Sequence, residues 1–440
     1  MRNKEFLLYK NFKRPEILND MSILIEETEK TSVKDNKDKL LYLFYDIASN
    51  LIELAASHGY KGNLWHMYLT YLLANNENPY SLATEQKGDI NGTLNDIALH
   101  DFEIFRSLFE IDLDIIEKKL NTGCMDQIVH FEGPDENGKL FNKRVRDRIC
   151  RLGTSLSKTH SVEDFKAVIT DFYKEFGVGK FGLHKAFRVE RNKKDEVVIK
   201  PITKITHVYL DDLVGYEIAK QKLIDNTEAF VYGRPANNCL LFGDAGTGKS
   251  SSIKGILNKY YENGLRIIEI YKHQFKDINA VIAQIKNRNY KFILYMDDLS
   301  FEDFEIEYKY LKAVIEGGLE KKPDNVLIYA TSNRRHLIKE TWSDREDVRN
   351  DNGIHKSDTM QEKLSLVYRF GVTIYFEKPD KKEFQNIVKV LARKKGLNIP
   401  DEELLMSANR FELNHGGLSG RTAVQFIDYL LGKDEKRGDH

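Results

Sequence analysis

The chain has 440 residues and a formal net charge of −1, with 67 Lys and Arg against 68 Asp and Glu. This balance excludes a global field that would steer the molecule to nucleic acid or to an anionic membrane, although a local basic patch remains open. Hydrophobic residues make up 41% of the chain, so it can form packed cores, and its length exceeds the roughly 250–300 residues of a single core. We therefore expect two or three folded domains.

The three cysteines, Cys124, Cys150 and Cys239, are too few and too scattered for a disulfide framework or a zinc site. The first residues, MRNKEFLLYKNFKRPE, contain no apolar run of signal-peptide length, and no later stretch approaches about 18 uninterrupted apolar residues. We expect reduced thiols, no membrane association and a cytoplasmic location.

Residues 1–200 are predicted to form a mostly α-helical domain. Apolar residues recur at helical spacing between Pro15 and Leu120, and residues 162–179 predict one more amphipathic helix. Between Cys124 and Gly153 the pattern is mixed. The segments KFGLHKAFRVE and EVVIKPI alternate around a polar turn as in a β-hairpin, where we place the end of the domain. The region contains no motif of known chemistry, so we assign it partner binding.

Residues 201–379 are predicted to form an α/β domain with a parallel sheet. Strands are expected at 238–243, 266–271, 291–298, 325–333 and 371–377, separated by helix-length crossovers. Such alternation is typical of a sheet covered by helices on both faces. Residues 380–440 contain three helical patterns and no strand, which predicts a small helical lid.

The segment GDAGTGKS, residues 243–250, fits the phosphate-loop pattern G-x-x-x-x-G-K-[ST], known as Walker A, between a predicted strand and a predicted helix. Its glycines let backbone N–H groups turn toward phosphate oxygens, and the helix N-terminus favours an anion. Lys249 would reach the β- and γ-phosphates, and the Ser250 hydroxyl would hold Mg²⁺. The alternative, an ordinary glycine turn, does not account for this spacing. The expected phosphate-binding residues are Gly243, Asp244, Ala245, Gly246, Thr247, Gly248, Lys249, Ser250 and Ser251.

A metal-orienting carboxylate follows the buried strand FILYM, where open α/β sheets place their ligands. Asp297 is the expected Mg²⁺ partner, through water, as in a Walker B motif. Asp298 stands where many such enzymes carry a glutamate that polarises the attacking water. Because aspartate is one methylene shorter, either that water sits closer or Glu302 polarises it instead. The alternative is a solvated strand end.

The next strand ends in Thr331, Ser332 and Asn333. An amide at this edge can hold the attacking water or contact the γ-phosphate, whereas Asn is also a common turn residue. The phosphate loop and the carboxylates favour the catalytic role for Asn333.

Together these motifs resemble the AAA+ ATPases over most of residues 205–431. The resemblance implies that Val214 and Gly215, within LVGY, pack on adenine. It also implies that Arg369 is an arginine finger offered to a neighbouring subunit, and that Arg421, within GGLSGRTAVQF, is the lid's sensor 2. The alternatives are a surface charge at a helix end for Arg369 and a helix-start salt bridge for Arg421. Arg334 and Arg335 are further candidates for contacts in trans.

More narrowly, four separated motifs resemble a bacterial family of predicted AAA+ ATPases of uncharacterised function, whose own pattern carries the Asp297-Asp298 pair. The resemblance implies ATP and Mg²⁺ as cofactors. It also implies a homo-oligomer, because an arginine supplied by a neighbouring subunit speeds hydrolysis by roughly 10³–10⁵ and makes turnover depend on assembly. We expect an ATP-hydrolysing remodeller of an unknown protein client. The alternatives are a nucleotide-dependent switch with little turnover and a DNA-associated loader.

Two further patterns bear on the client. The segment YKHQFKDIN lacks the glycine of protein-threading loops, which disfavours threading. The basic clusters RNKK (191–194), NRRH (333–336) and ARKK (392–395) are short, so nucleic-acid binding is possible but unsupported.

Overall fold

The computed structural model describes residues 4–29, 36–133, 143–203, 205, 208–301, 306–316, 323–333 and 366–434. The chain divides into two compact units, Met1–His184 and Lys185–His440. The division precedes the expected boundary near residue 200, because the predicted hairpin belongs to the sheet of the second unit.

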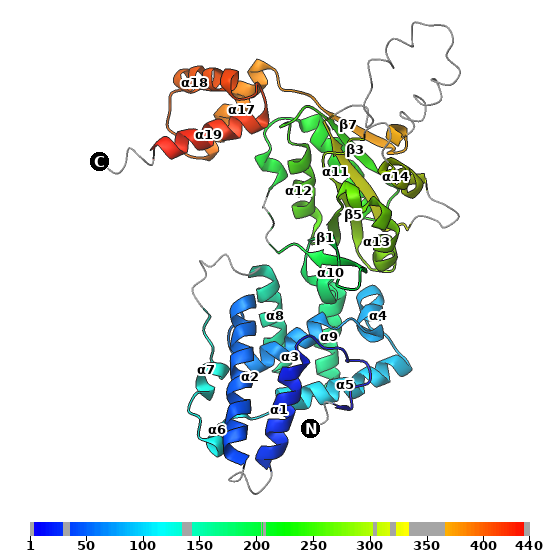
Figure 1. The fold of residues 1–440 in the computed structure, drawn as a ribbon, viewed down its shortest axis with the longest axis vertical. Helices are drawn as coiled ribbons and strands as arrows, with labels where there is room; N and C mark the ends of the chain where they lie inside the picture. Colours follow the sequence, from blue (N-terminus) through cyan, green and yellow to red (C-terminus); the bar gives the residue numbers. More distant parts are fainter. Residues whose placement is uncertain are drawn as a thin grey trace. The chain divides into compact units, whose positions relative to one another are not determined.

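The first unit consists of helices (Figure 1). Asparagine, aspartate or serine side chains cap the N-termini of α3, α4, α6 and α9 by accepting a backbone N–H. The helices are α1 (Pro15–Glu29), α2 (Lys37–His58), α3 (Leu64–Asn75), α4 (Pro79–Lys87), α5 (Thr93–Phe109), α6 (Leu113–Leu120), α7 (Met125–Val129), α8 (Lys143–Leu156), α9 (Val162–Phe176) and α10 (Gly179–Leu183).

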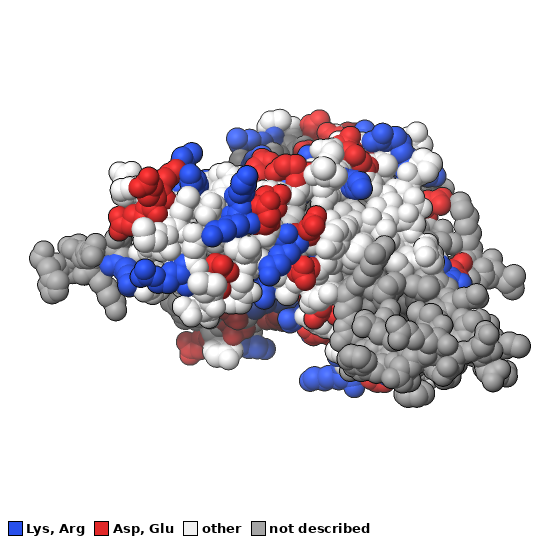
Figure 2. All heavy atoms as spheres, turned by 90° about the horizontal axis from the view of Figure 1, so that it is seen from above, with Lys and Arg blue, Asp and Glu red and all other residues white. Residues whose placement is uncertain are grey.

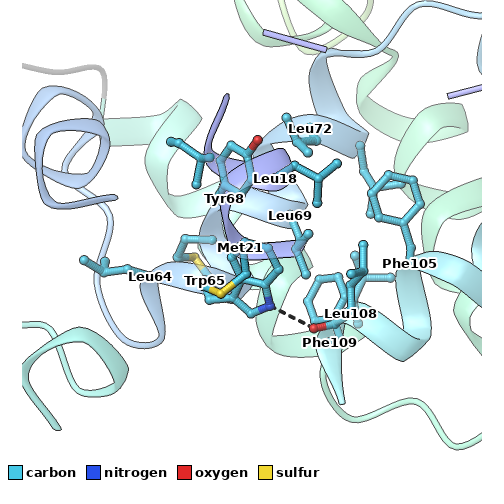
Figure 3. Close-up of a cluster of buried hydrophobic side chains, with 14 of the residues drawn as sticks. Leu18, Met21, Leu64, Trp65, Tyr68, Leu69, Leu72, Phe105, Leu108 and Phe109 are labelled. Carbon is cyan, nitrogen blue, oxygen red and sulfur yellow. Dashed lines mark hydrogen bonds between the residues drawn. The ribbon is translucent and has the colours of Figure 1, made fainter. Parts of the chain in front are cut away.

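Helix α3 lies at the centre of the first unit. It is apolar around its circumference, and its side chains pack between residues of α1 and α5 (Figure 3). The indole N–H of Trp65 donates to the carbonyl oxygen of Leu108 at 2.8 Å, so the largest buried side chain keeps its polar group satisfied.

Helix α8 occupies part of the stretch where the sequence pattern was mixed. Arg146 and Arg148 lie on its buried face, 7% and 6% exposed, and the Arg148 guanidinium stacks 4.2 Å from the ring centroid of Phe176. The apolar residues of its buried face, Val145, Ile149, Leu152 and Leu156, recur at helical spacing, so the pattern of this helix was present in the sequence among its charged residues.

The second unit contains a seven-stranded sheet of order β2-β1-β4-β5-β6-β3-β7. All neighbours are parallel except the hairpin partners β1 and β2, and β1 joins the sheet by pairing Ala186 with Ile267 of β4. The five predicted strands, the predicted hairpin and the parallel sheet are confirmed. The strands are β1 (Ala186–Arg191), β2 (Val197–Pro201), β3 (Cys239–Gly243), β4 (Leu265–Glu269), β5 (Lys291–Met296), β6 (Val326–Ser332) and β7 (Val372–Phe376).

Helices cover both faces of this sheet (Figure 1). α11 (Glu217–Val231) and α12 (Lys249–Tyr260) share a hydrophobic core with one face, and α13 (Ile278–Ile285) and α14 (Glu307–Glu316) lie on the other. Short 3-10 helices, η3 (Leu210–Asp212) and η4 (Lys272–Asp277), complete the layers. Burial on both faces explains why β5 and β6 are apolar without alternation.

The three predicted lid helices are α17 (Lys381–Lys394), α18 (Asp401–Asn414) and α19 (Gly420–Asp434), drawn in orange and red in Figure 1. They enclose a small core of their own, against which Val214 also packs. No helix among the described residues is long and apolar enough to cross a membrane.

Candidate functional site

The phosphate loop joins β3 to α12 and requires glycine at several positions. Gly243 has a φ of 137°, and a Cβ there would stand 2.1 Å from the carbonyl oxygen of Phe376. Gly248 has a φ of 89° and directly precedes α12, and a Cβ built there meets no heavy atom within 4 Å. The loop therefore keeps an open concavity at a helix N-terminus, which fits an anion.

The Lys249 ammonium lies folded against the loop. It donates to the carbonyl oxygens of Gly243 and Asp244 at 2.7 and 2.6 Å, and to Asn333 Oδ1 at 3.1 Å. Burial lowers the pKa of Lys249, although Asp244, Asp298 and Asp297 oppose that shift. An incoming anion would offset the burial of this charge.

Asp297 follows β5 and receives hydroxyl donors from three elements. Its Oδ1 accepts from Ser250 and Tyr295 at 2.7 Å each and from Thr331 at 2.6 Å. Burial acts to raise the pKa of Asp297, but these hydrogen bonds outweigh it and hold the pKa below its ordinary value. An ionised carboxylate beside a serine hydroxyl is the donor set that Mg²⁺ prefers.

Asp298 lies next to the metal-binding candidates in a constrained turn. Its φ is 51°, and its N–H donates to Thr331 Oγ1 at 2.9 Å. Its carboxylate Oδ1 accepts from Asn333 Nδ2 at 2.7 Å. Because Asn333 also accepts from Lys249, its amide bridges the lysine and the carboxylate.

A cavity of about 570 Å³ opens over these groups. Its lining combines the phosphate loop and the carboxylates with apolar side chains, a combination that suits a nucleotide with a charged and a planar part. Its lining comprises Asp212, Leu213, Val214, Tyr216, Lys220, residues 245–252, Asp297, Asp298, Thr331, Asn333, Ile387, Leu391, Gly420, Arg421, Val424 and Gln425.

Tyr216 lines the cavity, and its own hydroxyl is buried. Its ring lies 5.6 Å from that of Phe376, and its buried hydroxyl has no hydrogen-bond partner among the described residues. Burial, with the charges of Glu383 and Asp244, raises the pKa of Tyr216 to about 12. A buried hydroxyl without a partner costs stability.

The lid meets the phosphate loop directly. The Arg421 N–H donates to the carbonyl oxygen of Gly246 at 3.2 Å, and a Cβ on Gly246 would lie 3.0 Å from Ser419 Oγ. The start of α19 therefore seats on the loop, which brings Arg421 into the cavity lining.

The structure brings most of the expected site residues together. Residues 245–251, Val214, Asp297, Asp298, Asn333 and Arg421 line the cavity. Gly215 and Asp244 adjoin lining residues in the chain, and Gly243 precedes Asp244. Arg369 does not line it and pairs instead with Glu316 of α14. Glu302, Arg334 and Arg335 lie outside the described residues.

Two residues near the carboxylates were absent from the expected set. Tyr295 and Thr331 both donate to Asp297. The available signals were the i, i+2 spacing of Tyr295 and Asp297, which places both on one side of a strand, and the position of Thr331 near the end of an apolar strand.

Two of the basic clusters contain ion pairs with nearby aspartates. Arg191 pairs with Asp195 and Asp277, and Lys394 bonds the Asp211 carbonyl and pairs with Asp212. On the face drawn in Figure 2, cationic and anionic side chains are interspersed. Of the third cluster, only Asn333 belongs to the described residues.

The phosphate loop after β3, the acidic pair after β5 and the order of the parallel strands define a P-loop NTPase fold of the AAA+ class. The chain belongs to the family described as "Protein of unknown function (DUF815)", which matches residues 182–434, more than half of its length. The predicted resemblance to an uncharacterised AAA+ family is confirmed. No curated protein matches the chain.

Similar solved structures include RuvB of Thermotoga maritima. One RuvB mutant is 19% identical with a TM-score of 0.35 over 51% of this chain and 65% of its own. The structure titled as the RuvB Holliday junction branch migration motor is 20% identical with a TM-score of 0.34 over 50% and 63%. This chain thus spans less than two thirds of these RuvB chains. Likeness of this degree decides nothing about its activity or partners.

Proposed function

We propose that this protein binds and hydrolyses ATP with Mg²⁺ and couples turnover to movement of its lid, remodelling an unknown protein partner. The observation that carries the proposal is one hydrogen-bonded cluster. Ser250 bonds Asp297, while Asn333 bonds both Lys249 and Asp298, although these residues come from three separate segments. The lid's Arg421 lines the same cavity.

The residues divide the work by their chemistry. The loop N–H groups and Lys249 bind the phosphates, and Val214 with Gly215 positions the adenine. Ser250 and Asp297 hold Mg²⁺, which when bound offsets the charge of the phosphates. Asp298 orients the attacking water and accepts its proton, while Asn333 fixes that water beside the γ-phosphate. Arg421, which lies on the lid, contacts the γ-phosphate.

Turnover in this proposal depends on a homo-oligomer. Arg369 pairs with Glu316 and does not line its own subunit's cavity. An arginine so placed fits a finger that acts on a neighbour's nucleotide, where it would supply roughly 10³–10⁵ in rate.

A second candidate, a nucleotide-dependent switch with little turnover, is favoured by one contact. The Asp298 carboxylate is shorter than glutamate, and Asn333 already engages its Oδ1. If that bond persists with nucleotide bound, the Asn333 amide stays on Asp298 and does not fix the attacking water, so turnover would be slow and the protein would signal occupancy instead. A DNA-associated loader has less support, because the basic clusters at 191–194 and 392–395 contain ion pairs with nearby aspartates.

The test is ATP turnover measured across protein concentration, alongside ADP binding by calorimetry with Mg²⁺. Native protein should show specific activity that rises with concentration. Arg369→Ala should retain ADP binding and lose about 10³-fold or more in turnover. Arg410→Ala, an exposed arginine of α18 outside the cavity lining, is the matched control and should behave as native.

Three results distinguish the candidates. Specific activity that does not change with concentration would remove the role of Arg369 in trans. Tight binding of ATP with negligible turnover at every concentration would favour the switch. Absence of any adenine nucleotide binding by the native chain, or unchanged binding by Lys249→Ala, would remove the proposal as a whole.

A further inference from the structure

The inference concerns the tyrosine that points at the metal-binding carboxylate. Tyr295 lies within β5 and is 4% exposed, in the core shared with α11 and α12. Because side chains two residues apart lie on the same side of a strand, its ring extends toward Asp297. Its hydroxyl reaches Asp297 Oδ1 at 2.7 Å.

The donors to Asp297 all meet one oxygen. Ser250, Tyr295 and Thr331 donate to Oδ1, which has two lone pairs and is therefore saturated. Among the described residues no hydrogen bond is formed by Oδ2. Since Asp297 lines the cavity, the carboxylate is held with one oxygen tied to the protein and the other available.

We propose that Tyr295 and Thr331 are positioning residues for Mg²⁺, which fix the rotation of the Asp297 carboxylate so that Oδ2 faces the metal's water shell. This rests on the proposed function, because the metal belongs to the nucleotide site. The Ser250 hydroxyl donates its proton to Oδ1, so a lone pair of its oxygen would remain for the metal. Tyr295 and Thr331 then hold the carboxylate in place without depending on the metal.

Of the two residues, Tyr295 offers the cleaner test. Thr331 Oγ1 also accepts the Asp298 N–H, so its removal perturbs both carboxylates. Partners of this kind typically change metal affinity or activity about 10–100-fold when removed. The effect should therefore appear in the Mg²⁺ dependence of nucleotide binding, apart from any measurement of turnover.

The experiment compares Tyr295→Phe with Tyr329→Phe. Tyr329 is the register partner of Tyr295 on β6, but its hydroxyl bonds Asn226 and Thr227 of α11. Both variants lose one buried hydroxyl from neighbouring positions of one sheet. ADP binding is measured by calorimetry in EDTA and across a Mg²⁺ titration, with Mn²⁺ paramagnetic resonance as a direct probe of the metal.

In EDTA, Tyr295→Phe should bind ADP with the affinity of the native protein. It should need about 10-fold or more Mg²⁺ to reach half of the Mg²⁺-dependent increase in ADP affinity, the Mg²⁺ midpoint. Tyr329→Phe should keep the native Mg²⁺ midpoint. Equal midpoints for Tyr295→Phe and native protein, or equal shifts in both variants, would overturn the positioning role while leaving nucleotide binding intact. Native protein that binds no ADP would instead overturn the proposed function, and this inference with it.

A second pair of variants covers the case in which Tyr295→Phe does not fold. Thr331→Ser keeps the hydroxyl and should keep the native Mg²⁺ midpoint, whereas Thr331→Val removes it at nearly the same volume and should raise the midpoint. Identical midpoints for the serine and valine variants would contradict the inference.

Discussion

Replacing Gly243 by alanine is expected to separate β7 from β3. The φ of 137° is a conformation that L-residues rarely adopt, and the added Cβ would stand 2.1 Å from the Phe376 carbonyl oxygen. That oxygen is backbone, so β7 itself must shift. The strained φ costs about 1–3 kcal/mol. The forced shift adds about 1–3 kcal/mol.

The matched control is Gly264→Ala, at the turn before β4. Gly264 has a φ of 91°, and its Cβ would meet nothing within 4 Å, so this variant carries the backbone strain without the collision. The difference between the two variants therefore isolates the contact with Phe376, about 1–3 kcal/mol.

Amide hydrogen exchange of β3 and β7 peptides measures this difference in the intact chain, because it reports the opening of one part of a structure. A free-energy difference of about 1.4 kcal/mol changes the opening equilibrium tenfold. The β7 amides should therefore exchange roughly 5- to 150-fold faster in Gly243→Ala than in Gly264→Ala. Equal exchange in the two variants would refute the reasoning, because backbone strain would then account for the whole effect.

Two further predictions concern carboxylates that each accept at least three hydrogen bonds. Since the pKa of folded Asp297 lies below its ordinary 3.8, its ionised form contributes stability that is present above that value and is lost as pH falls through the folded value. Asp297→Asn should lose less stability than native protein over this pH range, as followed by circular dichroism during acid unfolding. The same pH dependence in variant and native protein would contradict this prediction. Asp101 is fully buried and accepts the N–H groups of Leu7, Leu8 and Tyr9. Asp101→Asn should weaken this anchor by about 1.5–3 kcal/mol and admit proteolysis ahead of α1; an unchanged cleavage rate would show that other contacts hold the segment.

The central sheet could be predicted because its strands are buried on both faces and stand between helical patterns. Residues 292–296 form an unbroken apolar run, which a half-exposed strand would not show. The hairpin could be predicted from alternation, but its place beside β4 could not. Alternation determines which side chains face the core, whereas the pairing of Ala186 with Ile267 joins residues far apart in the chain.

Some features of the candidate site could likewise be predicted from the sequence, and others could not. The spacing in GDAGTGKS reflects backbone geometry that only glycine allows, so the loop was visible in the sequence. Tyr295 was not, because a tyrosine within an apolar strand is expected in the core, and only the position of its hydroxyl reveals the bond to Asp297. The partner of Arg369 was also hidden, since Glu316 lies 53 residues earlier in the chain.

The contact between lid and phosphate loop has a mechanical consequence for the proposed coupling. The carbonyl oxygen of Gly246 accepts the Arg421 N–H, and it belongs to the same planar peptide as the N–H of Thr247. In a trans peptide the two groups point in opposite directions, so any rotation that brings the loop N–H to an anion also moves the lid's acceptor. Gly246 further lets Ser419 approach closely, because a Cβ there would lie 3.0 Å from Ser419 Oγ. The peptide between Gly246 and Thr247 would therefore contact the phosphate on one side and the lid on the other. In the proposed coupling the lid can respond to the nucleotide through this peptide, without a longer chain of contacts.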